Sequence, residues 1–124
     1  MDDKEKLKIV NKAEELFDCT LTNTSNRKKF PAKYRTLVKR MQNKSIDIYE
    51  CLMEANRQRL YIPKEKIERN RLQTLAITYC DHLNMFIETS KNHNLISFGL
   101  CEEWSKKVKD VKYMTIAWRT SEIG

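Results

Sequence analysis

Residues 32–60 read AKYRTLVKRMQNKSIDIYECLMEANRQRL, and the spacing of their apolar side chains decides the fold. Apolar and small residues recur there at alternating steps of three and four, namely at Tyr34, Val38, Met41, Ser45, Ile48, Leu52 and Ala55. Such steps place side chains on one face of an α-helix. Pro31 precedes the segment, where a proline's missing N–H costs nothing. The pattern predicts a helix from about Ala32 to Leu60 with one face against a core.

Three further segments repeat this spacing, at about Lys4–Thr22, at about Lys64–Lys91 and after the N-cap residue Ser97. Their expected core positions are Leu7, Val10, Ala13, Phe17 and Leu21, then Leu72, Ala76, Tyr79, Leu83, Phe86 and Ser90, then Cys101, Trp104, Val108, Val111, Thr115 and Trp118. The whole chain of 124 residues holds only two glycines and two prolines. Long helices joined by short turns pack antiparallel. We predict one all-α domain over residues 1–124, an up-down-up-down four-helix bundle.

A second apolar line runs along the helix at 32–60, roughly 100° around from the first. It consists of Ile46, Tyr49, Met53 and Leu60, and the helix at 64–91 repeats it more weakly with Ile77, Cys80 and Ile87. Two apolar faces indicate that one is buried in the bundle and the other against a second copy. We therefore expect a homo-oligomer with a subunit interface at Ile46, Tyr49 and Met53. A single wide stripe in a monomer is the alternative.

Positive charge is concentrated in one part of the chain. The sequence has 24 Lys and Arg against 17 Asp and Glu, a net charge of +7, and residues 27–71 hold 14 basic against 5 acidic side chains. Basic patches favour polyanions such as RNA and DNA. One cluster comprises Arg27, Lys28, Lys29, Lys33, Arg40 and Lys44, and a second comprises Arg57, Arg59, Lys64, Lys66, Arg69 and Arg71. The pattern predicts phosphate-directed binding with little sequence preference, because no base-reading motif or aromatic RNA-binding signature is visible. Ordinary solvated lysines are the alternative.

The sequence offers no catalytic or metal-binding motif. Two glycines cannot supply a phosphate-binding loop or a dinucleotide-binding fingerprint. The four cysteines, at positions 19, 51, 80 and 101, and the two histidines, at 82 and 93, match no zinc spacing. We expect a protein that is not an enzyme and uses no metal or cofactor. The mixed charges of residues 1–6 and the lack of a long apolar run predict a cytoplasmic protein with no membrane association.

Several short motifs carry a resemblance to a known family. They are FPAKYR at 30–35, RMQN at 40–43, LMEAN at 52–56, LIS at 95–97 and the ending AWR at 117–119 followed by SE at 121–122. In these motifs the chain resembles the accessory variability determinant proteins of diversity-generating retroelements. Proteins encoded in intervening sequences of 23S ribosomal RNA genes share that family's bundle fold.

The resemblance implies a small basic four-helix bundle that assembles as a homopentamer. It further implies binding to RNA or DNA and to a reverse transcriptase, in support of mutagenic reverse transcription that diversifies a target gene, with no catalytic activity of its own. The family's basic surface corresponds by residue type to Lys33, Arg35, Lys39, Arg40 and Lys44, and Lys28 and Lys29 adjoin it. The alternative function is that of a structural or protein-interaction bundle of the ribosomal intervening-sequence type.

An acidic surface is the expected docking face for a reverse transcriptase. A polymerase that handles nucleic acid is expected to be basic, so the basic segment of this chain would repel it. Acidic side chains occur on the first and last expected helices, at Glu14, Glu15 and Asp18 and at Glu102, Glu103 and Asp110. Opposite charge speeds encounter and fixes the register of a complex. We expect the reverse transcriptase to bind at these residues.

Overall fold

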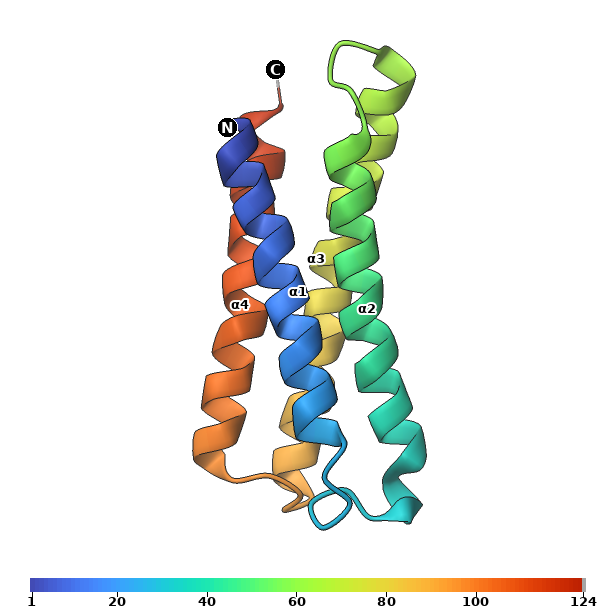
Figure 1. The fold of residues 1–124 in the computed structure, drawn as a ribbon, viewed down its shortest axis with the longest axis vertical. Coiled ribbons are helices and arrows are strands. Elements are labelled where there is room, and N and C mark those ends of the chain that lie inside the picture. The colour runs from blue at the N-terminus through green and yellow to red at the C-terminus, as the bar shows by residue number, and fades with distance from the viewer. Residues whose placement is uncertain (124) are drawn as a thin grey trace.

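A computed structural model describes residues 1–123, and in this range the chain is helical with no strand. The helices are α1 (Asp3–Thr24), α2 (Arg35–Arg57), α3 (Pro63–Asn92) and α4 (Phe98–Ser121), with a 3-10 turn η1 (Ala32–Tyr34) before α2. They run up, down, up and down (Figure 1), so the predicted four-helix bundle is confirmed. No helix within residues 1–123 is both long enough and apolar enough to cross a membrane.

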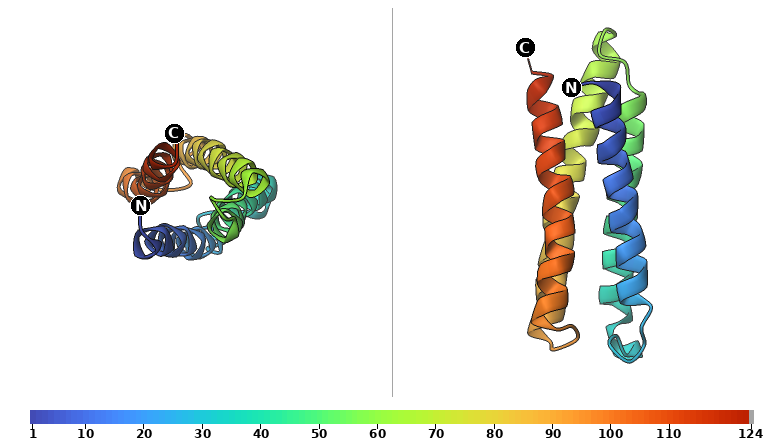
Figure 2. Two further views of the ribbon diagram at one scale, coloured as in Figure 1. Left: turned by 90° about the horizontal axis from the view of Figure 1, so that it is seen from above. Right: turned by 60° about the vertical axis from the view of Figure 1, so that its left-hand side comes forward.

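The helices form a closed ring in chain order. Each helix packs against the next one, and α1 packs against α4, while the diagonal pairs make no such contact. The view along the bundle in Figure 2 shows this arrangement. Both termini and the α2–α3 turn lie at one end, called the termini end (Figure 1). Residues 25–34 and 93–97 connect helices at the opposite end, called the far end.

Two helix boundaries differ from those predicted. The helix expected over 32–60 begins with η1 and ends at Arg57, because Gln58 adopts an extended backbone with ψ of 138°. The next N–H, that of Arg59, is capped by the Glu65 carboxylate at 3.0 Å. At the other boundary, α1 continues to Thr24. The Thr24 hydroxyl is satisfied within this last turn, where it donates to the Thr20 carbonyl at 2.7 Å.

The core stripe of α1 is shifted from the predicted one. Ile9, Ala13 and Leu16 are buried, whereas Leu7 is 53% exposed and Leu21 is 39% exposed. Both sets have helical spacing, so the choice depends on what the neighbouring helix offers. Thr20 lies on the buried stripe and its hydroxyl accepts a hydrogen bond from the Trp104 indole N–H of α4 at 3.2 Å, which satisfies both polar groups inside the core.

The prediction of a second, outward apolar face on α3 is also wrong. Cys80 and Ile87 are completely covered by the chain's own core, together with Leu83. Tyr79 and Phe86, which were expected in that core, are only partly buried at its margin. The predicted stripe of the α2 helix, in contrast, is confirmed at five of its seven positions: Met41, Ser45, Ile48, Leu52 and Ala55 are buried, while Tyr34 and Val38 are only partly buried.

Candidate nucleic-acid interface

One stretch of the chain contains no carboxylate side chain. Between Asp18 and Asp47 there is no Asp or Glu. Residues 19–46, called here the acid-free segment, form the end of α1, the connection to α2 and the first half of α2 at the far end. Its eight basic residues are Arg27, Lys28, Lys29, Lys33, Arg35, Lys39, Arg40 and Lys44. The segment includes all seven side chains predicted to bind nucleic acid.

These eight cations have no ion-pair partner within residues 1–123. None of them lies within 4.0 Å of a carboxylate oxygen in the described chain. Seven are exposed, and Lys44 is partly buried. Unneutralised cations at a solvent-facing surface can neutralise phosphates and so release the counterions condensed on a nucleic acid. The segment therefore presents a surface able to bind phosphates.

The second predicted basic cluster, at the termini end, is largely neutralised. Arg57 pairs with Glu54 at 3.1 Å, and Arg59 pairs with Glu65 at 2.7 Å. Arg71 is also paired, through Glu68. Lys64 and Lys66 have no such partner in the described chain. Both clusters are basic by sequence, but the structure shows that the cations of the first have no ion pairs while most of those in the second are paired.

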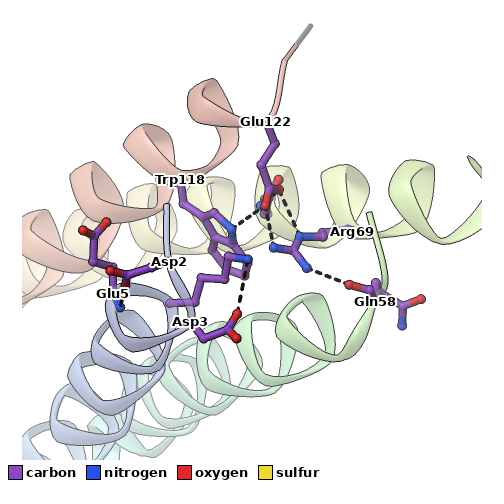
Figure 3. Close-up of polar contacts among 9 residues, drawn as sticks. Asp2, Asp3, Glu5, Gln58, Arg69, Trp118 and Glu122 are labelled. Atoms are coloured by element: carbon purple, nitrogen blue, oxygen red, sulfur yellow. Dashed lines mark hydrogen bonds and ion pairs between the residues drawn. The ribbon is translucent and has the colours of Figure 1, made fainter. Parts of the chain in front are cut away.

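Arg69, which was predicted in that second surface cluster, is buried. Its guanidinium donates to the Glu122 carboxylate, with an Nε to Oε1 distance of 3.0 Å, and to the Gln58 carbonyl at 2.6 Å (Figure 3). Its exposed fraction is only 4%, so it is not available to nucleic acid. Arg69 lies three and seven residues before the core positions Leu72 and Ala76, a spacing that could have identified it as buried.

The Glu122 carboxylate, which follows the last residue of α4, accepts two further hydrogen bonds, one from α3 and one from α4. Gln73 Nε2 donates to it at 2.9 Å and the Trp118 indole N–H at 2.8 Å. Burial by itself raises the pKa of Glu122, but the hydrogen bonds from Arg69, Gln73 and Trp118 and the positive charge of Arg69 outweigh it and hold that pKa below 4.5. The cluster is a satisfied structural network at the termini end.

The basic residues of α2 lie on two sides of that helix. At roughly 100° per residue, Arg40 and Lys44 lie on the side of α3, and Lys44 Nζ is 4.5 Å from the centroid of the Tyr79 ring. Arg35 lies beside the end of α1, and Lys39 lies opposite the buried stripe of α2, toward the outside. The predicted binding residues therefore flank α2 rather than forming one row.

Arg35 and Arg27 line an open groove between the end of α1 and the start of α2. The groove has a volume of about 400 Å³, and its other lining residues are Thr24, Ser25, Phe30, Pro31, Ala32 and Val38. Lys28 and Lys29 lie in the same connection, where their backbone N–H groups donate to the Asn26 side-chain oxygen at 3.0 and 3.4 Å. Two unpaired guanidinium groups beside a groove can bind a phosphate from two sides.

Of the predicted subunit-interface residues, Tyr49 contacts α1 of its own chain. The Tyr49 ring lies 6.5 Å from that of Phe17, centroid to centroid, and its hydroxyl donates to Glu14 Oε2 at 3.0 Å. This hydrogen bond, with the nearby carboxylate charge, raises the pKa of Tyr49. Ile46 is partly buried, and Met53 is 37% exposed. Tyr49 thus already has a partner within its own chain, and Met53 is the more exposed end of the line.

The acidic residues predicted to bind a polymerase lie on the adjacent helices α1 and α4. Glu15, Asp18 and Glu103 are exposed. Three of the six are engaged within the chain. Glu14 accepts a hydrogen bond from Tyr49, Asp110 pairs with Lys106, and Glu15 pairs with Lys12.

Within residues 1–123, no group of three or more His, Cys, Asp or Glu side chains lies close enough to hold a metal ion. None of the four cysteines forms a disulfide. Burial raises the pKa of Cys51 to about 11 and that of Cys80 to about 12, so both remain protonated, unreactive thiols at neutral pH.

The chain matches no protein-family model, no curated protein and no solved structure.

Proposed function

We propose that the protein is a non-enzymatic accessory factor that binds RNA or DNA through its acid-free segment and supports a retroelement reverse transcriptase. The observation that carries the nucleic-acid part is the contrast between the two basic clusters. Eight cations of the acid-free segment are unpaired in the described chain, whereas Arg57, Arg59 and Arg71 are neutralised by carboxylates. The resemblance to accessory variability determinant proteins supports the reverse-transcriptase part.

The proposed binding is directed to phosphates and tolerant of sequence. Binding that releases counterions from a nucleic-acid backbone is driven by salt-dependent entropy and does not depend on base identity. The exposed Lys and Arg side chains of the acid-free segment suit this mode, because each is a cation on a long, flexible stem.

Charge reversal tests the location of the binding surface. The variant Arg40→Glu with Lys44→Glu is expected to weaken binding to all sequences alike, measured by fluorescence anisotropy with labelled RNA and DNA of several sequences. The matched control, Arg57→Glu with Arg71→Glu, changes the net charge equally but removes cations that are already paired. Equal loss in both double variants would show that only net charge matters and that the acid-free segment is not the site.

We include oligomerisation in the proposal, with five subunits as the resemblance implies. Met53 and Ile46 are the apolar side chains proposed to make the contact between subunits. A charge introduced there would be buried without a partner, which is costly. Met53→Glu is expected to reduce the assembly measured by light scattering after size exclusion while leaving the helical circular dichroism unchanged. A wild-type protein that is monomeric at micromolar concentration would contradict this part.

The acidic face of α1 and α4 is the proposed docking site for the reverse transcriptase. Asp18 and Glu103 are the best positions to test, because they are exposed and have no ion pair in the described chain. Asp18→Lys with Glu103→Lys is expected to reduce capture of the polymerase after nuclease treatment and to leave RNA binding unchanged or stronger. Capture that survives this variant but disappears with nuclease alone would mean that RNA bridges the two proteins.

A further inference from the structure

Two tyrosine–histidine pairs lie along the seam between α2 and α3. Tyr34 and His93 meet edge to face at the far end, with ring centroids 5.9 Å apart and an interplanar angle of 71°. Tyr79 and His82 lie further along α3, with centroids 6.2 Å apart. Both tyrosines are partly exposed, and the two pairs contain both histidines of the chain. α2 and α3 pack against each other in the bundle.

A lysine of the acid-free segment lies over the ring of each of these tyrosines. Lys33 Nζ lies 5.2 Å from the centroid of the Tyr34 ring, and Lys44 Nζ lies 4.5 Å from that of Tyr79. Arg40 is exposed between them on the same side of α2. Lys33 and Lys44 are eleven residues apart, which corresponds to about 16 Å along a helix. The seam therefore alternates aromatic rings and unpaired cations along one line.

Aromatic rings alternating with cations suit a single strand better than a duplex. The bases of a duplex are stacked inside it, so a protein surface reaches mainly its phosphates. The unpaired bases of a single strand can stack on aromatic side chains while lysines and arginines contact the backbone. A lysine whose only contact with a ring is a cation–π contact can leave the ring face, so that a base stacks there while the ammonium group contacts a phosphate.

We propose that this seam binds single-stranded nucleic acid, with bases stacked on Tyr34 and Tyr79 and phosphates on Lys33, Arg40 and Lys44. The inference rests on the proposed nucleic-acid-binding function and adds the form of nucleic acid that the protein prefers. The two tyrosines are 45 positions apart in the chain, and only the antiparallel packing of α2 and α3 brings them onto one seam.

Another tyrosine provides a matched control. Tyr113 of α4 is 60% exposed, and Lys112 Nζ lies 5.6 Å from its ring centroid. Lys112, however, is held by Asp81 at 2.7 Å. Tyr113 therefore has the same type of neighbour, but its lysine is paired and lies outside the acid-free segment, so removal of this ring is not expected to affect binding.

The test compares a short unstructured single strand with a duplex of the same length by fluorescence anisotropy at fixed salt. Tyr34→Leu with Tyr79→Leu is expected to weaken single-strand binding ~30-fold or more, since loss of each base stack weakens binding at least ~5-fold. Duplex binding is expected to stay unchanged within about twofold. Tyr113→Leu is expected to change neither. Equal losses for strand and duplex, or no loss for the strand, would overturn the inference.

A second measurement on the wild-type protein requires no variant. An abasic strand keeps the phosphates but has no bases to stack on either tyrosine, so it is expected to bind at least ~30-fold more weakly than the base-bearing strand. Equal affinity for the two strands would overturn the stacking inference while leaving phosphate-directed binding intact. Failure of the wild-type protein to bind either strand or duplex would instead overturn the proposed function itself.

Discussion

Removal of the Glu122 carboxylate is expected to be among the most damaging single changes to the bundle. The Arg69 side chain is 5% exposed and that of Glu122 is 10% exposed, so Glu122→Ala leaves a guanidinium buried without its counter-charge. Breaking such a pair on one side costs about 3–5 kcal/mol. Arg69 keeps its bond to the Gln58 carbonyl, so we expect the lower end, about 3 kcal/mol. Trp118 and Gln73 lose an acceptor as well.

Urea unfolding monitored by circular dichroism at a fixed protein concentration measures this loss. The control is Glu68→Ala, which breaks the exposed pair with Arg71 and is expected to leave the unfolding midpoint nearly unchanged. The double variant Arg69→Met with Glu122→Leu removes both charges and is expected to regain much of the lost stability. A loss below about 1 kcal/mol for Glu122→Ala would refute the reasoning, because a buried, unpaired guanidinium is expected to destabilise the fold by more than that.

Three further outcomes follow from the buried groups. The pKa of Glu122 is lower in the folded protein than its ordinary value of 4.5. The contribution of Glu122 to stability is therefore complete above pH 4.5 and is lost as the pH falls below that value. Glu122→Gln should flatten the acid side of a plot of unfolding free energy against pH. Thr20→Val leaves the Trp104 indole N–H without its acceptor in the core and should cost about 1–3 kcal/mol in urea unfolding, whereas no loss would show that the indole finds another partner. Thiol titration with a disulfide reagent at neutral pH should leave Cys80 and Cys101, both buried, unreacted until urea is added, and rapid reaction of either in the native protein would contradict the packing.

The fold could be predicted from the sequence because the spacing of apolar residues is unambiguous on α2. On α1 it is not, since Leu7 and Ile9 both begin stripes of helical spacing. The buried stripe is the one that packs against the neighbouring helices, as the contact between Thr20 of α1 and Trp104 of α4 illustrates, and periodicity within one helix cannot show such a contact.

The sequence predicts which basic residues make up the candidate site, but not which of them form ion pairs. Counting lysines and arginines finds both basic clusters, but it cannot show which of them are neutralised. The pair between Arg59 and Glu65 depends on the path of the α2–α3 turn, and the pair between Arg69 and Glu122 joins residues far apart in the chain. The absence of carboxylates from residues 19–46 is the one sequence signal that separates the two clusters in advance.

The salt dependence of binding tests the central claim most directly. Each cation that neutralises a phosphate of a single strand adds about 0.7 to the magnitude of the slope of log affinity against log salt concentration. Arg40→Gln with Lys44→Gln should therefore reduce the slope for a single strand by about 1.4, while Arg57→Gln with Arg71→Gln, whose wild-type cations are already paired, should leave it unchanged. An unchanged slope in the first variant, or an equal reduction in the second, would contradict the assignment of the acid-free segment as the nucleic-acid interface.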